Sequence, residues 1–298
     1  MGTDTEPLNS LMRSVLFVPA MVTRFVERAP DTNADVVCLD VEDSVPPDEK
    51  PKARAMAGEA IDGMAKGGFQ LWVRVNGLAT GMLEDDLLAV VRPGLDGILL
   101  PKSDSADVVK RAEHYLTLLE RERGMAPGSV SITPLVETAA GILRSYEVCT
   151  ASSRSAGVAF GAEDLATDMR IRRTREGEEV RWARAQLAIA AHAAGLVAID
   201  TPEPDYTDLA YLETECSLAR SLGYQGKLCI HPDQVTVANR VFSPTDGEIS
   251  EAREIVELFE REGIARGRAA IPANGKMIDT PIYSRARRLI EWAGRAEK

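Results

Sequence analysis

The chain has 298 residues, of which 45% are hydrophobic and 27% are charged, a globular composition that excludes wholesale disorder. Its 46 acidic residues outnumber 35 basic ones, and the resulting formal charge of −11 argues against broad nucleic-acid binding, which needs a basic surface. No apolar run approaches the roughly 18 residues that span a bilayer, and the polar N-terminus lacks a signal-peptide pattern, so we expect a cytoplasmic protein without membrane contacts.

Short apolar runs alternate with helical patterns along most of the chain. Several runs, such as VLFV, LWVRV and DGILL, are nearly continuous in apolar residues, which is typical of strands buried on both faces of a parallel sheet. The segments between them carry apolar residues at helical spacing. The expected strands are, in chain order, 14–20, 35–40, 70–76, 96–102, 129–137, 157–164, 196–200 and 226–231.

Eight strands that alternate with helices predict an α/β fold of the (β/α)8 TIM barrel type. An open, doubly wound sheet is the alternative, because periodicity does not reveal whether a sheet closes. The sequence PAMVTRF follows the first strand, where a dinucleotide-binding fold would carry G-x-G-x-x-G. Beyond the last strand we expect a charged helix over 250–266, a loop over 267–275 and a helix over 277–296. The prediction is therefore a barrel over 11–242 and a C-terminal helical extension over 243–298, which packs on the barrel or reaches a neighbouring subunit.

Polar residues close most of the expected strands. In a TIM barrel the active site lies at the C-terminal ends of the strands, so these charges are expected to converge on one mouth. Strand ends are often polar simply because they meet solvent, and the clustering therefore carries more weight than any single residue. The residues are Asp40, Glu42, Asp43, Arg74, Asn76, Lys102, Glu137, Glu163, Asp164, Asp200 and His231.

Glu137 and Asp164 are the candidate metal pair, because they close consecutive strands that are neighbours in a barrel. A set of carboxylates without nearby histidine or cysteine suits a hard cation such as Mg²⁺, which takes one or two protein carboxylates. From the residues alone, a helix cap with a salt-bridge partner explains the two side chains equally well.

Arg74 lies at the same mouth, where a guanidinium suits a carboxylate or a developing oxyanion. The alternative is an ion pair with Glu42 or Asp43, and these two acids can also orient Arg74 or metal-bound water. Arg24 and Lys102 are candidates for contacts with phosphates, although a surface role is the more common fate of an exposed arginine.

Other potentially reactive groups give weaker signals. His231 is either a general base or, more commonly for such a residue, a structural histidine bonded to the backbone. The charged segment 169–179 is interpreted as a solvated loop rather than a mobile lid. The cysteines form no C-x-x-C pair, which argues against a disulfide framework or a zinc site; they are Cys38, Cys149, Cys216 and Cys229.

Eight short motifs carry a resemblance to a known family. They are RSVLFVPA (13–20), CLDVEDSV (38–45), VRVNG (73–77), LPK (100–102), VETAAG (136–141), FGAEDL (160–165), IHP (230–232) and GKMIDTP (275–281). In this order they resemble the citrate lyase beta-subunit-like group, which includes malyl-CoA and citramalyl-CoA lyases. The resemblance runs from about residue 13 to 293. It implies a Mg²⁺-dependent barrel that makes or breaks a carbon–carbon bond beside a CoA thioester, in a homotrimer or homohexamer.

The resemblance also implies roles for individual residues. Glu137 and Asp164 match the family's metal ligands, and Glu137 also meets the substrate. Arg74 matches an arginine that stabilises the thioester oxyanion. Asp279 matches an aspartate that reaches the active site of an adjacent subunit, where it can move a proton. Three further residues match positions near CoA or the substrate; they are Phe17, Arg24 and Lys102.

The implied activity is a stand-alone lyase that converts a 3-hydroxyacyl-CoA, such as malyl-CoA or citramalyl-CoA, to an acyl-CoA and a 2-oxoacid, or the reverse. One alternative is a citrate lyase beta subunit that acts on a citryl thioester with a carrier-protein partner. A second is a non-catalytic CoA-binding protein, against which the metal pair argues. A thioesterase is a variant of the first activity. The GAEDL and IHP motifs resemble the stand-alone branch.

Overall fold

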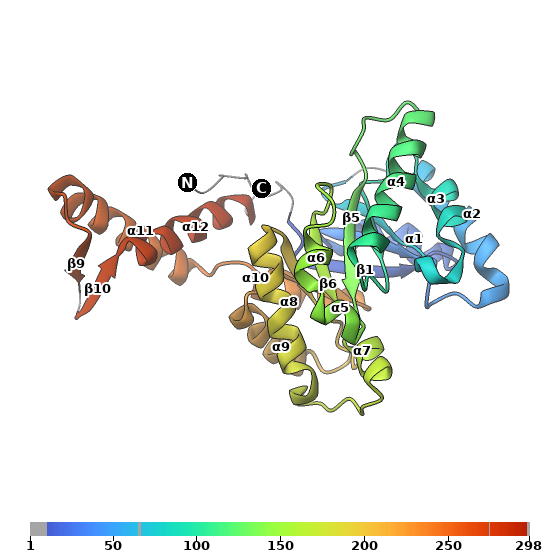
Figure 1. Cartoon of the computed structure of the whole chain (residues 1–298). Coiled ribbons are helices and arrows are strands. Elements are labelled where there is room, and N and C mark those ends of the chain that lie inside the picture. The colour runs from blue at the N-terminus through green and yellow to red at the C-terminus, as the bar shows by residue number, and fades with distance from the viewer. Residues whose placement is uncertain (1–10, 65–66, 274, 297–298) are drawn as a thin grey trace. The chain divides into compact units, whose positions relative to one another are not determined.

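A computed structural model describes residues 11–64, 67–273 and 275–296, which fall into two compact units within 1–240 and 241–298. In the first unit, eight parallel strands pair in chain order and close into a barrel (Figure 1). Closure comes from β1 and β8, where Val15 pairs with Leu228. The predicted TIM barrel is therefore confirmed over the open sheet. The strands are Ser14–Pro19 (β1), Val36–Asp40 (β2), Gln70–Arg74 (β3), Gly97–Leu100 (β4), Ser131–Val136 (β5), Gly157–Phe160 (β6), Val197–Asp200 (β7) and Gly226–Cys229 (β8).

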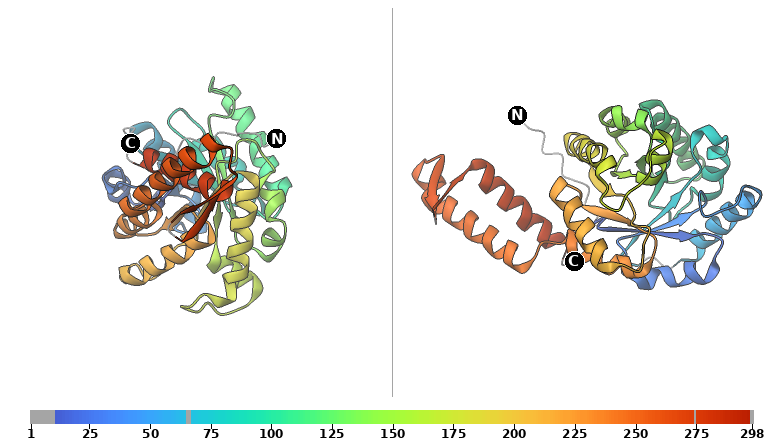
Figure 2. Two further views of the ribbon diagram at one scale, coloured as in Figure 1. Left: turned by 90° about the vertical axis from the view of Figure 1, so that its left-hand side faces the viewer. Right: turned by 90° about the horizontal axis from the view of Figure 1, so that it is seen from below.

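Helices lie outside the strands, as Figures 1 and 2 show. Among the described residues, no helix is long and apolar enough to cross a membrane. The α-helices of this unit are Thr23–Arg28 (α1), Lys50–Gly63 (α2), Leu83–Val90 (α3), Ala106–Glu122 (α4), Ala139–Leu143 (α5), Ser145–Cys149 (α6), Ala162–Met169 (α7), Arg181–Ala194 (α8), Leu209–Leu222 (α9) and Pro232–Phe242 (α10), the last of which ends in the second unit. Short 3-10 turns are Ala29–Thr32 (η1), Pro47–Glu49 (η2), Leu78–Thr80 (η3) and Glu178–Val180 (η4).

The barrel interior is an apolar core that collects side chains from most of the strands, including Val15, Cys38, Trp72, Leu99 and Ile199. All five residues of β2 are buried, as its unbroken apolar run predicts. Full burial of one such aliphatic side chain contributes roughly 1.5–3 kcal/mol. This core fixes the strands, and the strands in turn fix the residues that follow them.

All four cysteines are free and buried. Burial raises the pKa of each thiol, that of Cys149 to about 12. A thiol with a raised pKa carries little thiolate at neutral pH, so these side chains act as small apolar groups and not as nucleophiles.

Four predicted strand ends were placed two or more residues too late. β3 ends at Arg74 and β4 at Leu100, two residues before the predicted ends. β6 ends at Phe160, and residues 162–164 already form the first turn of α7. β8 ends at Cys229, and His231 directly precedes α10. In α7 the reason is local, because Glu163 and Asp164 interact favourably with the positive end of the helix dipole.

The first helix that lies wholly in the second unit is α11 (Asp246–Glu262), whose start is set by a capping box between Thr245 and Glu248. A 3-10 turn (η5, Ile264–Arg266) follows. An antiparallel hairpin of β9 (Ala270–Ala273) and β10 (Lys276–Asp279) comes next, and α12 (Thr280–Ala296) completes the unit. The hairpin replaces the predicted loop and the first residues of the predicted final helix, so that part of the prediction is wrong.

The hairpin forms because it supplies the unit with a core. Ile271 of β9 pairs with Ile278 of β10, and both pack against Phe259 of α11. Tyr283 of α12 stacks on Phe259 with ring centroids 5.0 Å apart. Figure 2 shows α11 and α12 running side by side in this unit.

Candidate active site

A pocket of about 430 Å³ opens at the C-terminal ends of the barrel strands. It brings together four predicted site residues from four different strands or their following segments: Phe17, Arg74, Glu137 and Asp164. The other lining residues are Pro19, Asp40, Asp43, Ser44, Leu135, Gly161, Ala162, Glu163, Thr201, Pro202, Leu228 and Ile230. The predicted convergence of strand ends on one mouth is thus present in the structure.

Arg74, the last residue of β3, is held rigidly in this pocket. Its Nε and Nη2 donate to the two carboxylate oxygens of Asp40 at 2.7 Å each, a bidentate pair between neighbouring strands. Its Nη1 lies 3.0 Å from Asp43 Oδ2 and 3.2 Å from Glu42 Oε2. The guanidinium also lies over the Phe17 ring, 4.4 Å from the centroid.

The ion pair with Asp40 is the strongest electrostatic feature around Arg74. Burial acts to raise the pKa of Asp40, but the adjacent guanidinium outweighs it and holds the pKa below its ordinary value. Arg74 in turn has a raised pKa, because Asp40 and its acidic neighbours outweigh the effect of burial. Arg74 is therefore a fixed positive charge with a defined orientation.

Glu137 and Asp164 face one cation, the ammonium of Lys102. Lys102 Nζ lies 3.2 Å from Asp164 Oδ1, 3.9 Å from Glu137 Oε1 and 3.6 Å from Glu42 Oε1. Oxygens from three segments thus surround a single positive group. The predicted metal pair is brought together, and the ammonium stands where a cation is favoured.

Lys102 also contacts Glu137 through its backbone. Its amide N–H donates to Glu137 Oε1 at 2.8 Å. The residue adopts φ = 51°, a left-handed conformation that is uncommon outside glycine and that clusters at functional sites. The strained residue aims an N–H at the carboxylate and so fixes one of its two oxygens.

We define the mouth cluster as Asp40, Glu42, Asp43, Arg74, Lys102, Glu137 and Asp164. Its five carboxylates face only two cations. Burial, reinforced by the charge of Asp164, raises the pKa of Glu137 to about 8. Burial likewise raises the pKa of Glu42 to about 7. The cluster is therefore short of positive charge.

A divalent cation would supply the positive charge that the mouth cluster lacks. Among residues 11–64, 67–273 and 275–296, no group of three or more histidine, cysteine, aspartate or glutamate side chains has metal-binding geometry. A pair of carboxylates is nevertheless the usual protein contribution to a Mg²⁺ site, which keeps several waters or substrate oxygens. Glu137, which is 3% exposed, and Asp164 thus suit a hard cation that replaces the Lys102 ammonium.

Asp200 does not join the mouth, although it closes β7. It is fully buried against Arg184 of α8 and Lys227 of β8, with its carboxylate oxygens 2.7 and 2.6 Å from their nitrogens. Arg184 also pairs with Glu215 of α9 at 3.0 Å. We call these four residues the sealed cluster. Asp200 is a structural residue, which corrects its inclusion among the mouth charges.

Three further residues from strand ends have local partners, although Glu163 also lines the pocket. Asn76 is buried and donates to Val41 O and to Asp86. Glu163 pairs with Arg173 at 2.9 Å in the segment after α7. His231 accepts from the amide of Asp233 at 3.2 Å and stacks on Tyr206, as expected for the backbone-bonded alternative.

The charged segment after α7 is irregular until η4, as predicted for a loop. Two of its arginines are paired locally, since Arg173 also pairs with Glu179 and Arg175 pairs with Asp208. These contacts account for Arg173 and Arg175 without a substrate.

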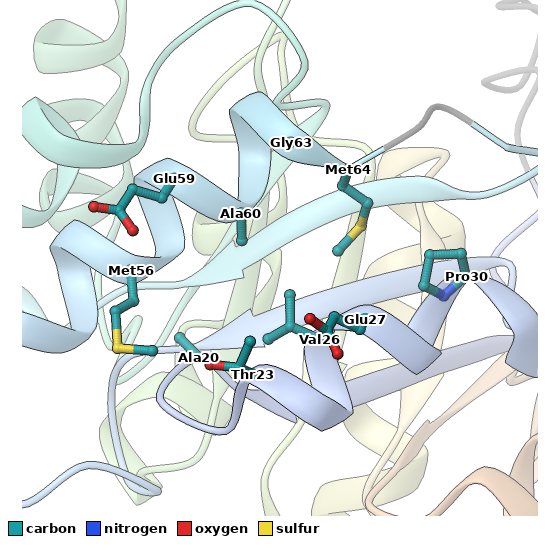
Figure 3. Close-up of a pocket in the computed structure, with 10 residues that line it drawn as sticks. All are labelled: Ala20, Thr23, Val26, Glu27, Pro30, Met56, Glu59, Ala60, Gly63 and Met64. Carbon is teal, nitrogen blue, oxygen red and sulfur yellow. The ribbon is translucent and has the colours of Figure 1, made fainter.

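A second groove, of about 490 Å³, lies between α1 and α2. Figure 3 shows Met56 of α2 and Met64, which follows α2, facing Val26 of α1 across it. Its charged lining residues are Glu27 and Glu59, both acidic. Because its lining residues include no cation for an anionic substrate, the mouth is the better candidate for the active site.

Three of the predicted residues do not line the mouth pocket. Lys102 contacts two of the carboxylates that line it, as described above. Arg24 is exposed on α1, with its guanidinium 4.8 Å from the centroid of the Phe25 ring. Asp279 ends β10 in the second unit, where its Oδ1 accepts from the amide of Ile282 at 3.1 Å. Within its own unit Asp279 therefore caps the start of α12.

Sequence reasoning missed the role of one mouth residue and the presence of another. Asp40 was noted only as a strand end, whereas it is the bidentate partner of Arg74. Thr201 lines the pocket and accepts the amide of Ala162 at 3.0 Å. For Asp40, the signal was available, because it occupies on β2 the position that Arg74 occupies on β3.

Comparisons with known proteins place these residues in a family context. A family model described as HpcH/HpaI aldolase/citrate lyase matches residues 13–232. The citrate lyase subunit beta of Leuconostoc mesenteroides subsp. cremoris is 36% identical over 95% of this chain and 93% of its own length. The L-malyl-CoA/beta-methylmalyl-CoA lyase of Cereibacter sphaeroides is 33% identical over 94% of both chains.

Solved structures agree with this match. The protein CitE from Mycobacterium tuberculosis, crystallised with magnesium, acetoacetate and coenzyme A, is 27% identical and gives a TM-score of 0.77 over 96% of this chain and all of its own. A citrate lyase from Burkholderia xenovorans is 19% identical, with a TM-score of 0.84 over 97% of this chain and 93% of its own, and supports the fold.

Proposed function

The chain belongs to the HpcH/HpaI aldolase/citrate lyase family, and we propose that it is a Mg²⁺-dependent carbon–carbon lyase acting on a 3-hydroxyacyl-CoA. It would cleave a compound such as malyl-CoA or citramalyl-CoA to an acyl-CoA and a 2-oxoacid, or catalyse the reverse condensation. One observation carries the proposal: two carboxylates that suit a metal lie in the same pocket as an immobilised arginine.

Glu137 and Asp164 would hold the Mg²⁺. When bound, the ion supplies Lewis-acid polarisation of the substrate hydroxyl or carbonyl oxygen. The charge deficit of the mouth cluster supports this assignment, because burial outweighs the Lys102 ammonium, 3.9 Å from Glu137 Oε1, and leaves the pKa of Glu137 raised. Lys102, which is 45% exposed at its side chain, is then available to meet substrate carboxylate or phosphate.

Arg74 would stabilise the negative charge that develops on the thioester oxygen when the carbon–carbon bond breaks. Its bidentate contact with Asp40 holds the guanidinium in place before substrate arrives, so little reorganisation is needed during the reaction. Phe17 covers one face of the guanidinium and excludes water from that side.

Coenzyme A carries phosphates, and this acidic protein needs local cations to bind them. Arg24 and Lys102 are the proposed contacts, and the exposed position of Arg24 on α1 supports its part. The solved relative with bound coenzyme A supports the choice of a CoA ester as substrate.

Asp279 would move the proton at the acyl carbon, from the C-terminal unit of a neighbouring subunit in a homotrimer or homohexamer. Its place at the end of β10, in a unit distinct from the barrel, supports this role. Mixing Asp279→Ala chains with Glu137→Ala chains tests it. Activity recovered in mixed oligomers supports a shared site, and no recovery after confirmed subunit exchange contradicts it.

A citrate lyase beta subunit, acting on a citryl thioester carried by a partner protein, is the second candidate. The 36% identity to such a subunit over almost the whole chain favours it. It differs from the first in needing a carrier protein in place of free coenzyme A.

Cleavage of malyl-CoA and citramalyl-CoA by the purified chain separates these functions. Thiol and 2-oxoacid are followed together, with Mg²⁺ or with EDTA, and Asp164→Asn serves as the matched variant. A 2-oxoacid that appears only with metal, while the thioester survives, supports the stand-alone lyase. Thiol without 2-oxoacid identifies a thioesterase. No product from either ester contradicts the stand-alone lyase for these substrates and favours the carrier-dependent one.

A further inference from the structure

The two metal-pair carboxylates are attached to different kinds of element. Glu137 directly follows β5, whereas Asp164 lies in the first turn of α7, beyond the end of β6. The position of Asp164 relative to Glu137 therefore depends on where α7 starts and how it is held. Three contacts fix this helix.

The first contact comes from another strand. The first backbone N–H groups of a helix have no partner within it, and Gly161, which precedes α7, has no side chain to supply one. Thr201, which follows β7 and is 5% exposed, fills this role: its Oγ1 accepts the amide of Ala162 at 3.0 Å. The cap of α7 is thus provided from 39 residues away.

The second contact ties the far end of α7 to the segment that carries Glu137. Asp168 Oδ2 accepts the amide of Ala139 at 2.8 Å, and Ala139 opens α5 just two residues after Glu137. The same helix that carries Asp164 therefore also binds the backbone beside the other carboxylate.

The third contact is steric. The amide of Gly161 donates to Val136 O at 3.1 Å, which brings the start of α7 against the end of β5. A Cβ added at Gly161 would lie 2.5 Å from Glu137 Oε2 and 2.6 Å from Glu137 Cβ. Only glycine permits this approach, so the backbone of residue 161 packs directly against the Glu137 side chain.

From these contacts we propose that Thr201 and Asp168 are positioning residues that hold α7 so that Asp164 and Glu137 share one cation. Thr201 acts at the start of the helix and Asp168 at its end, and neither is among the two proposed ligands. This inference rests on the proposed Mg²⁺ site. Groups that orient metal ligands typically change metal affinity 10–100-fold when they are removed.

The test compares Mg²⁺ and Mn²⁺ binding by calorimetric titration of the full chain without substrate. Thr201→Val keeps the shape of the side chain but removes the acceptor for Ala162, and we expect affinity to fall about 10–100-fold. Thr201→Ser keeps the hydroxyl and should restore most of the affinity. Thr117→Val is the matched control, because the hydroxyl of Thr117 lies on α4, away from the mouth, and accepts from Arg154.

The outcomes separate this inference from the proposed function. Weakened binding in Thr201→Val and Asp168→Ala, with near wild-type binding in Thr201→Ser and Thr117→Val, supports the inference. Equal binding by wild type and Thr201→Val overturns it and leaves the metal site standing. No binding by the wild type overturns the proposed function together with this inference.

Activity gives a second readout. If Thr201 acts through the metal pair, raising the Mg²⁺ concentration should return the kcat of Thr201→Val toward the wild-type value, with KM for the CoA ester unchanged. A kcat that stays low at saturating Mg²⁺ would contradict a role in positioning the metal pair.

Discussion

The mouth cluster and the sealed cluster are both networks of charged residues near the C-terminal ends of barrel strands, but their charge balance differs. The sealed cluster pairs two carboxylates with two cations, and its Arg184–Asp200 and Lys227–Asp200 contacts measure 2.7 and 2.6 Å. The mouth cluster has five carboxylates for two cations, and the lysine contacts in it are 3.2 Å or longer. The charges of the sealed cluster are balanced within the protein, whereas the mouth cluster needs a further cation.

This difference shows how structural charged residues at strand ends can be distinguished from functional ones. Burial alone does not do so, because Asp200 and Glu137 are both almost inaccessible. The pKa does: it is lowered at Asp200, where the cations outweigh burial, and raised at Glu137, where burial dominates. A buried carboxylate that the protein leaves undercompensated is the better marker of a site.

The largest effect should come from breaking the sealed cluster. Arg184→Met leaves the buried Asp200 and Glu215 short of a cation, and we expect the free energy of unfolding to fall by about 3–5 kcal/mol. Urea unfolding measures this loss. Arg240→Met removes an exposed pair with Glu213 and is the control, for which little change is expected. A similar small change in both variants would contradict a structural role for the sealed cluster.

Next in size is the loss of Arg74 from the mouth cluster. Arg74→Lys keeps the charge but not the bidentate fork with Asp40, and kcat should fall about 10²–10³-fold. Steady-state cleavage of the CoA ester at saturating Mg²⁺ measures it. A kcat within a few-fold of wild type would show that the orientation of the guanidinium is unimportant.

A third prediction concerns pH. Because burial and Asp164 raise the pKa of Glu137 to about 8, a proton occupies this carboxylate at lower pH and must leave when Mg²⁺ binds. Affinity for Mg²⁺ should rise about tenfold per pH unit below pH 8 and level off above it. Calorimetric titration at several pH values tests this, and a pH-independent affinity would contradict it.

The raised pKa of Glu137 also determines how the stability of the metal-free protein changes with pH. Unfolded Glu137 releases its proton near the ordinary value of 4.5, whereas the folded side chain keeps it up to about pH 8. The unfolded state therefore binds fewer protons in this range, and the contribution of Glu137 to stability should fall as pH rises from about 4.5 to 8. Glu137→Gln removes this dependence and serves as the control in urea unfolding.

The smallest effect is expected in the C-terminal unit, which takes part in neither cluster. Thr245→Ala removes the capping box of α11 and should lower the free energy of unfolding of that unit by about 1 kcal/mol. Mg²⁺ binding should not change. Thr245→Ser, which keeps the capping hydroxyl, is the matched control, and a loss of Mg²⁺ affinity in Thr245→Ala would contradict the separation of cap and site.

The sequence predicted all eight strands, because burial on both faces leaves a continuous apolar run that few other elements show. It also predicted that Arg74, Glu137 and Asp164 would meet, because parallel strands bring their C-terminal ends together. It failed at Asp200 for a specific reason. Neighbouring residues of a strand point to opposite faces, and the sequence does not say that Ile199 enters the barrel while Asp200 faces the helices.

Two other features lay outside what patterns can predict. The hairpin of the C-terminal unit has strands of only four residues, and Pro272 interrupts one of them, so no strand signal stands out. Thr201 meets Ala162 only after β6 and β7 pair, and a hydroxyl 39 residues away carries no local mark of that contact. Such cross-strand supports are visible only in three dimensions.

The closure of the barrel by β1 and β8 has a consequence during synthesis. Val15 pairs with both Val36 and Leu228, and the second partner emerges from the ribosome 213 positions later. At roughly 5–20 residues per second, one edge of β1 waits about 10–40 s for its neighbour. An apolar strand edge with unpaired backbone groups is a template for aggregation. The yield of folded enzyme should therefore depend on how well a chaperone protects this edge while translation continues.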